Sequence, residues 1–116
     1  MDIYHIWCDL KPGVHDLDFV AAAKSYFEQL KREGSLQVYR ITRRKLGLAP
    51  KELGDFHIML EFNNLGDLDT AFSAVASRTD PVESFHHAVN SKVSSLTFGL
   101  YRDFPDAVRQ EGEEKF

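Results

Sequence analysis

In four stretches of this chain apolar residues recur at every second position, and in stretches between them apolar residues recur at the spacing of a helix. The period-two stretches, which predict strands, are residues 2–10, 36–46, 55–63 and 93–102. Inward stripes at helical spacing follow the first and third strands, at Val20, Ala23, Phe27 and Leu30 and at Leu68, Phe72, Val75, Val82, Phe85, His86 and Val89. The order strand, helix, strand, strand, helix, strand predicts an α+β domain.

Residues that cap or break helices mark the helix boundaries. Asp16 or Asp18 is expected to cap the first helix, and Gly34 to end it. Residues 64–67 predict the start of the second helical region, and residues 80–83 (Asp-Pro-Val-Glu) a fresh start within it.

The two middle strands follow each other directly. Their connection, LGLAPKELG, is framed by Gly47, Pro50 and Gly54, so we expect a hairpin with a long loop. Right-handed crossovers around this hairpin give an antiparallel sheet in the spatial order 4-1-3-2, with both helices on one face. This is the ferredoxin-like βαββαβ arrangement.

Both faces of the predicted sheet are apolar. The face that suits the helices carries Ile6, Cys8, Ile58, Leu60, Phe62, Phe98 and Leu100. The second face carries Ile3, His5, Trp7, Tyr39, Ile41, His57, Met59, Val93, Thr97 and Tyr101. A sheet face left in water alternates with polar residues, and a contiguous apolar patch of this kind needs a cover. A second copy in a two-fold interface is the simplest cover, so we expect a homodimer.

Residues 2–102 resemble the dimeric α/β-barrel superfamily, and within it the stress-responsive α/β-barrel domains and related bacterial domains of unknown function. The resemblance rests on the element order, the apolar second face and the segment DPVESFHHAVNSKVSSLTFGLYRDF, in which Pro81 and His86 or His87 match a Pro and a His before the last strand. It implies two sheets packed face to face as a homodimeric α/β barrel. The superfamily includes cofactor-independent oxygenases, haem-degrading enzymes, isomerases and proteins without known activity, so it implies no single reaction.

Histidines and aromatic residues gather on the second face. If the first and third strands are neighbours, His5, Trp7, His57 and Glu61 share that face. Either histidine is then a candidate general base, because the pKa of imidazole lies near neutrality, and the aromatic rings would wall a small pocket. The candidate ligand-binding residues are His5, Trp7, Tyr39, His57, Met59, Glu61 and Tyr101. The alternative interpretation is that these residues pack in a dimer interface.

Metal and cofactor motifs are absent from the sequence. Zinc sites use combinations such as His5, His57 and Glu61, but these residues have no metal-motif spacing, so we expect neither a metal nor a cofactor. His86 and His87 are adjacent, so we expect one to face the core and the other the solvent. Cys8 is expected to be a buried structural thiol.

A basic cluster and a run of leucines lie at the end of the second strand. The cluster comprises Arg40, Arg43, Arg44 and Lys45. It is interpreted as a solvated strand end, with an anion site or a contact with the acidic tail as alternatives. The loop leucines are Leu46, Leu48 and Leu53, which predict either a pocket cover or a contact with a partner subunit.

The composition limits the function classes. The chain has 116 residues, with a single domain expected over residues 1–102 and an acidic tail over 103–116. Its net charge of −4 argues against nucleic-acid binding, and DFHIMLEF lacks the RNA-stacking pattern expected on a third strand. We expect no membrane span and a cytoplasmic location. A small-molecule binder, an oxygenase-like or isomerase-like enzyme with a pocket histidine, and a non-catalytic stress-related dimer remain open.

Overall fold

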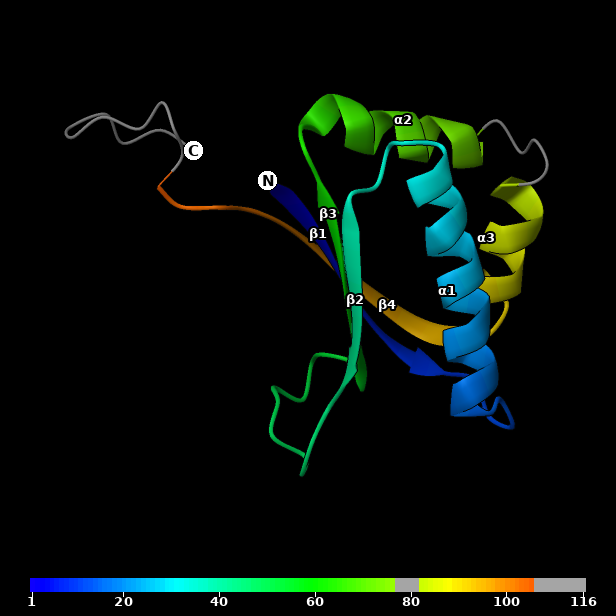
Figure 1. Cartoon of the computed structure of the whole chain (residues 1–116). Coiled ribbons are helices and arrows are strands. Elements are labelled where there is room, and N and C mark those ends of the chain that lie inside the picture. The colour runs from blue at the N-terminus through cyan, green and yellow to red at the C-terminus, as the bar shows by residue number, and fades with distance from the viewer. Residues whose placement is uncertain (77–81, 106–116) are drawn as a thin grey trace.

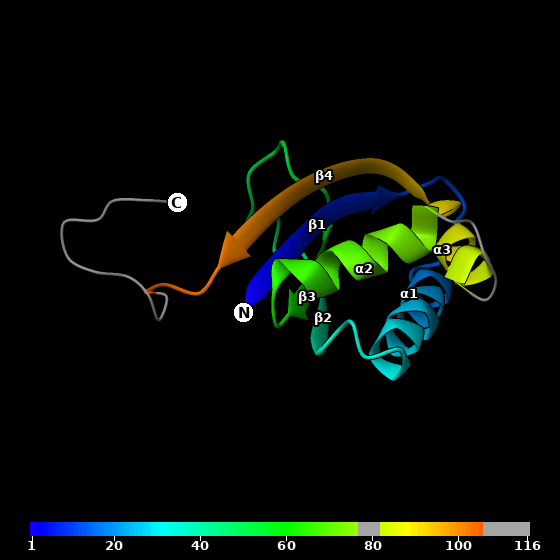
Figure 2. The same cartoon turned by 90° about the horizontal axis from the view of Figure 1, so that it is seen from above.

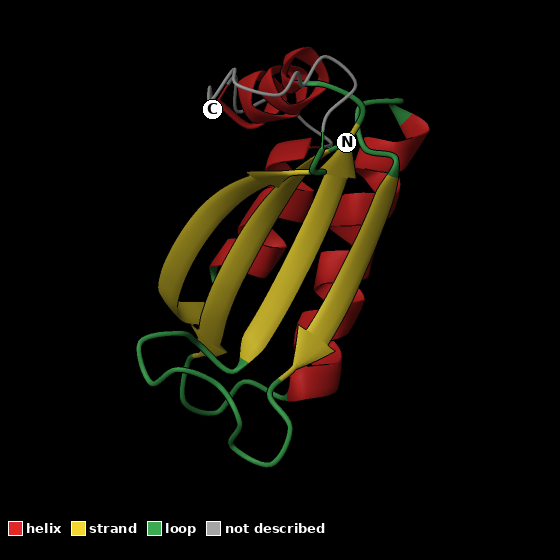
Figure 3. Ribbon diagram, turned by 90° about the vertical axis from the view of Figure 1, so that its left-hand side faces the viewer, coloured by secondary structure: helices red, strands yellow, loops and turns green. Residues whose placement is uncertain are grey.

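The computed structural model describes residues 1–76 and 82–105, which form one antiparallel sheet and three helices (Figure 1). The strands are β1 (Asp2–Leu10), β2 (Val38–Arg43), β3 (Phe56–Phe62) and β4 (Val93–Arg102). Their spatial order is β2-β3-β1-β4, and all three pairings are antiparallel (Figure 3). The order predicted from the sequence and the ferredoxin-like α+β fold are therefore confirmed.

The helices are α1 (Asp16–Arg32), α2 (Leu65–Ala76) and α3 (Val82–Asn90), and all lie on one side of the curved sheet (Figure 2). None of the helices in the described part of the chain is long and apolar enough to cross a membrane. Several positions that carried predictions are outside the part of the chain that the structure describes. They are the side chains of Val75, Val82, Glu83 and Phe85, residues 80 and 81 of the predicted helix start, and tail residues 106–116.

The helix ends follow the sequence with one correction. Gly34 ends α1 with a φ of +85°, and Asn64 Oδ1 accepts a hydrogen bond from the Asp67 N–H at 2.8 Å at the start of α2. The prediction that Asp16 or Asp18 caps α1 is wrong. His15 occupies the N-cap position without a side-chain cap hydrogen bond. The two carboxylates lie in the first turn, where their negative charge interacts favourably with the positive end of the helix dipole.

The hydrophobic core lies between the sheet and the helices. Phe19 and Phe27 of α1 are fully buried against Ile58 and Phe62 of β3. Cys8 is buried among them as predicted, and desolvation, together with the charge of Asp9, raises the pKa of its thiol to about 11. The thiol therefore remains protonated and unreactive near neutral pH.

The face assignments for β2 require a correction. Tyr39 and Ile41 lie opposite Leu60 and Ile58, so they face the helices and not the second face. The Tyr39 hydroxyl donates a hydrogen bond to Glu28 of α1 at 2.9 Å. The prediction extended the alternation back to Leu36, but Leu36 precedes the strand and reaches the core from the turn, so it does not set the register of β2.

Two further residues differ from their predicted environment. Val93 was expected on the second face but is buried in the core, because the register shifts between Asp9 and Leu10 where β1 and β4 diverge. Phe98 and Leu100 face the helix side as predicted, yet each is 54% exposed, because the helices leave the edge strand β4 partly uncovered.

Candidate functional site

We call the sheet side opposite the helices the far face (Figure 3). An aromatic and imidazole cluster lies on this face. Trp7 of β1 pairs with His57 of β3, and their rings stack with centroids 4.5 Å apart. His5 Nδ1 lies 2.9 Å from His57 Nε2, and the Tyr101 ring meets the His5 ring edge-on at 4.7 Å. Strand register thus brings together four of the predicted site residues, which we call the imidazole cluster.

The other predicted site residues divide between the two faces. Met59 pairs with His5 and, on its other side, with Arg40, so it lies beside the imidazole cluster. Glu61 is the next far-face residue of β3 beyond Met59. Tyr39 faces the helices and does not belong to this site.

The protonation of one imidazole disfavours the protonation of the other. Burial lowers the pKa of His5, and burial together with the neighbouring His5 lowers the pKa of His57. Both rings are therefore neutral near pH 7, so one donates its N–H to the bare nitrogen of the other. Gly99 of β4 leaves space for this arrangement, since a Cβ there would lie 3.4 Å from the Trp7 ring and 3.3 Å from the Tyr101 ring.

A cavity of about 270 Å³ lies on the other side of the sheet, between the strands and the three helices. Its lining is mainly apolar and includes Ile6, Phe72, Val89 and Phe98. A pocket had been predicted at the far face, whereas this cavity opens on the helix side. It exists because α2 and α3 leave the neighbourhood of β4 uncovered.

The polar residues that line this pocket include Tyr4 of β1 and residues of the helices. His86 and Asn90 are four residues apart on α3, so they share one face of the helix, and both line the cavity. The His86 ring meets the Tyr26 ring of α1 edge-on at 5.7 Å, and burial and Glu33 raise the pKa of Tyr26 to about 12. His86 is half-buried and His87 exposed, as their adjacency predicted.

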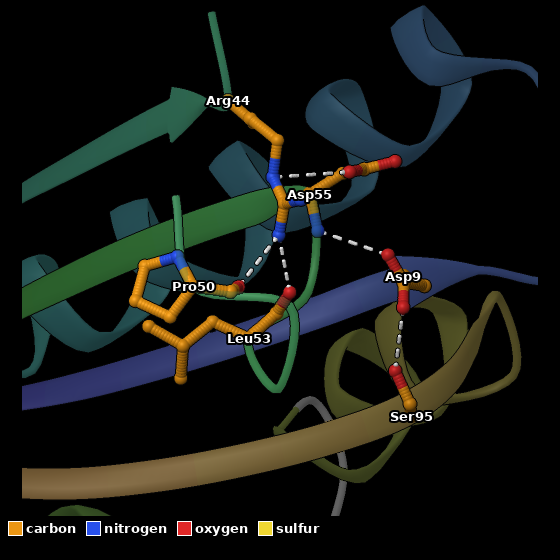
Figure 4. A network of polar contacts seen from close by, with 6 residues as sticks. All are labelled: Asp9, Arg44, Pro50, Leu53, Asp55 and Ser95. Atoms are coloured by element: carbon orange, nitrogen blue, oxygen red, sulfur yellow. Dashed lines mark hydrogen bonds and ion pairs between the residues drawn. The ribbon is translucent and has the colours of Figure 1, made fainter. Parts of the chain in front are cut away.

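Two of the four residues of the basic cluster at the end of β2, Arg43 and Arg44, make contacts within the fold. Arg43 forms an ion pair with Asp16 at 2.8 Å. Arg44 lies 3.5 Å from the Asp55 carboxylate and donates hydrogen bonds to the carbonyls of Pro50 and Leu53 (Figure 4). These contacts leave the two arginines poorly placed to form an anion site. Within the described residues, no group of three or more His, Cys, Asp or Glu side chains is placed to hold a metal ion.

The solved structures that resemble this chain share its fold at low sequence identity. SnoaB, a cofactor-independent oxygenase from Streptomyces nogalater, has 7% identity and a TM-score of 0.65, with 93% of this chain and 96% of that chain covered. A dimeric ferredoxin-like protein of unknown function from Jannaschia sp. CCS1 has 12% identity and a TM-score of 0.64, with 89% and 100% covered. A DABB family protein with a ferredoxin-like fold from Mesorhizobium loti has 13% identity and a TM-score of 0.61, with 88% and 95% covered.

These likenesses confirm the ferredoxin-like fold. No curated protein matches the sequence. One family model matches residues 1–116, the whole chain, and the chain therefore belongs to the family of unknown function DUF6614.

Proposed function

We propose that this protein is a homodimer that binds a small, mainly apolar molecule in the cavity between the sheet and the helices. The cavity itself carries the proposal. It is an apolar cleft of about 270 Å³ that is open to solvent beside the exposed rings of Phe72 and Phe98, and a concave, mainly apolar surface is typical of small-molecule sites. Burying this apolar lining under a ligand would remove it from water.

The cavity also indicates a ligand class. Its volume is near the lower end of the usual range for ligand pockets, roughly 300–1,000 Å³, so it suits a compact molecule of one or two rings. The lining over β1, β3 and β4 is mainly apolar, with Tyr4 as the exception on β1, while His86 and Asn90 offer polar groups from one helix face. A flat ring system with one hydroxyl or carbonyl group fits this distribution.

The far face supports the homodimer. Its centre is the neutral imidazole cluster, and Arg40 and Glu61 lie beside it on β2 and β3. A two-fold axis brings one patch against itself, so an axis that passes between Arg40 and Glu61 would set each opposite the unlike charge of the other subunit. The similar protein from Jannaschia is described as dimeric, which agrees with this proposal.

Native mass spectrometry of the purified protein tests both parts. We expect a mass of two chains, with an added small molecule where one is retained during purification. Binding of 2-naphthol, a compact two-ring probe, is then followed by ¹H–¹⁵N NMR. Shifts confined to α3, β4 and the facing part of α1 would support the cavity, whereas shifts confined to His5, Trp7 and His57 would move the ligand site to the far face.

A matched pair of variants on α3 sharpens the binding test. Val89 lines the cavity, so Val89→Phe should fill it and weaken 2-naphthol binding at least about tenfold. His87→Phe places the same ring on the exposed side of the same helix and should leave binding unchanged. Equal binding by both variants would place the ligand outside the cavity, and no binding by the wild type would favour the non-catalytic dimer.

A second candidate function is proton-transfer catalysis in the same cavity, and the pairing of His86 with Asn90 favours it. An imidazole can remove a proton from an acidic C–H or O–H group of a bound ligand, and an amide N–H four residues away can stabilise the resulting oxyanion. Such chemistry is common to isomerases and to oxygenases that need no cofactor.

Deuterium exchange tests this candidate. A ligand recovered from the protein is incubated with it in D₂O, and its mass is followed with time. Exchange that the wild type catalyses and His86→Gln does not, with binding retained in both, would support catalysis. Equal exchange rates with and without protein would leave binding as the only function of the cavity.

A further inference from the structure

The connection between β2 and β3, residues 44–55, extends beyond the lower end of the sheet on the side of the far face (Figures 1 and 3). We call this segment the β2–β3 arm. Leu46 and Leu48 are 83% and 80% exposed, although they are among the most apolar side chains of the chain. Exposed leucines that occur singly are ordinary, but two on one projecting loop form an apolar tip.

The base of the arm is held in place by Arg44. Its guanidinium donates hydrogen bonds to the carbonyls of Pro50 at 3.2 Å and Leu53 at 2.5 Å, and it pairs with the Asp55 carboxylate (Figure 4). The Asp55 N–H in turn donates to Asp9 of β1 at 2.9 Å. The arm is therefore tied both to itself and to the sheet.

The tip of the arm adopts an unfavourable backbone conformation. Leu46 has a φ of +56°, in the left-handed region that side chains with a Cβ rarely adopt, and Gly47 follows with +68°. Such strain persists only where the surrounding structure imposes it, and it often marks a functional contact. The turn is closed by a hydrogen bond from the Leu48 N–H to the Lys45 carbonyl at 3.0 Å, and both leucines that flank Gly47 are exposed.

We infer that the β2–β3 arm is part of the dimer interface, with Leu46 and Leu48 packing on the partner subunit, an inference that rests on the homodimer proposed above. The arm stands on the same side of the sheet as the imidazole cluster, which the second copy would cover. Burial against that copy explains why a tethered loop presents leucines. The arm extends away from the helices (Figure 1), and the pocket on the helix side is lined by no residue of the arm.

Sedimentation velocity over a concentration series tests the inference with paired variants. We expect Leu46→Glu/Leu48→Glu to weaken the dimer by tenfold or more, because each glutamate would be buried or would hold the interface open. The control is Leu17→Glu on α1, a leucine that is 78% exposed on the helix side. Circular dichroism checks that both variants fold.

The outcomes separate the arm from the dimer itself. A monomeric wild type would refute the homodimer, whereas a dimeric wild type with an unchanged double variant would refute only the role of the arm. Binding of the wild type, but not of the double variant, to phosphatidylglycerol vesicles, together with an unchanged dimer, would assign the leucines to a membrane surface and also overturn the inference.

A second measurement locates the arm directly. Cys8 is buried, so a thiol introduced by Leu48→Cys can be labelled selectively with a nitroxide. Mixed dimers are formed from a labelled protomer and a ¹⁵N protomer without the label. We expect the far-face amides of the ¹⁵N protomer to broaden, and no such broadening from a label at Leu17→Cys. Intact mixed dimers without broadening from position 48 would contradict the inference.

Discussion

His5 and His57 share one hydrogen bond across two neighbouring strands, with Nδ1 of the first ring 2.9 Å from Nε2 of the second. Because an uncharged imidazole has one donor and one acceptor nitrogen, this contact forms when both rings are neutral and also when a single extra proton is added. A second proton would set two positive charges side by side. Protonation of this pair therefore changes the charge of the far face in the pH range where histidine titrates.

We predict that folded stability falls as the pH is lowered through this range. Burial lowers the pKa of both rings, so between their lowered values and the ordinary value of about 6.5 the unfolded chain binds more protons than the folded chain. These groups cost no stability above about pH 7, and acidification favours unfolding. Urea unfolding at pH 7.5 and pH 5.5 measures the fall in the free energy of unfolding.

The matched variants for this prediction are His57→Gln and His87→Gln. Removing His57 should reduce the difference between the two pH values, while His87→Gln, at an exposed position, should keep it. The charged neighbours Arg40 and Glu61 are present in all three proteins and cancel in the comparison. An identical fall in the wild type and His57→Gln would show that the imidazole pair does not control the response.

We predict that Trp7→Lys abolishes the dimer. The indole lies at the centre of the far face, stacked on His57, and a lysine there would bring an unpaired charge into the proposed interface at a cost of several kcal/mol. Sedimentation velocity should show a monomer or loss of soluble protein. Leu17→Lys, on the exposed side of α1, is the control and should remain a dimer. A soluble Trp7→Lys dimer of wild-type affinity would exclude this interface.

The fold was predictable because it depends on local periodicity. The alternation in β1, β3 and β4 and the apolar stripe of α1 predicted the faces of those elements, except at Val93, where the register shifts. The sheet order then followed from the handedness of the crossovers. In β2, Leu36 misled the assignment: a buried residue before the strand suggested the wrong face for Tyr39. A strand of six residues at the edge carries too short a pattern to correct such an error.

The candidate sites were predictable to different degrees. The adjacency of His5, Trp7 and His57 followed from pairing β1 with β3, because directly opposed residues share a face. The cavity did not follow, since it depends on how far α2 and α3 extend over β4. Two signals were available in the sequence. His86 and Asn90 lie four residues apart on one helix, and the strand that follows has more apolar residues than two short helices can cover.

We predict that Arg44→Ala loosens the β2–β3 arm whereas Arg43→Ala does not. Loss of the Arg44 guanidinium removes the donor to the carbonyls of Pro50 and Leu53, which water then hydrates, so we expect a cost of about 0.5–1.5 kcal/mol. The Arg43 ion pair with Asp16 is exposed and worth about 0–1 kcal/mol. Limited trypsin digestion measures the difference, as cleavage after Lys45 should accelerate only in Arg44→Ala. Equal rates in the two variants would mean that Arg44 does not anchor the arm.

We predict that Gly54→Ala destabilises the fold although Gly54 lies in a loop. A Cβ at this position would overlap the backbone of Cys8, whose Cα would be only 2.8 Å away, so β1 or the end of the arm must shift. Overpacking of this kind costs about 1–3 kcal/mol. The control is Glu52→Ala, an exposed position in the same arm, which should change stability by less than about 0.5 kcal/mol. Urea unfolding compares the two, and a Gly54→Ala midpoint equal to that of the wild type would show that β1 and the arm can separate without cost.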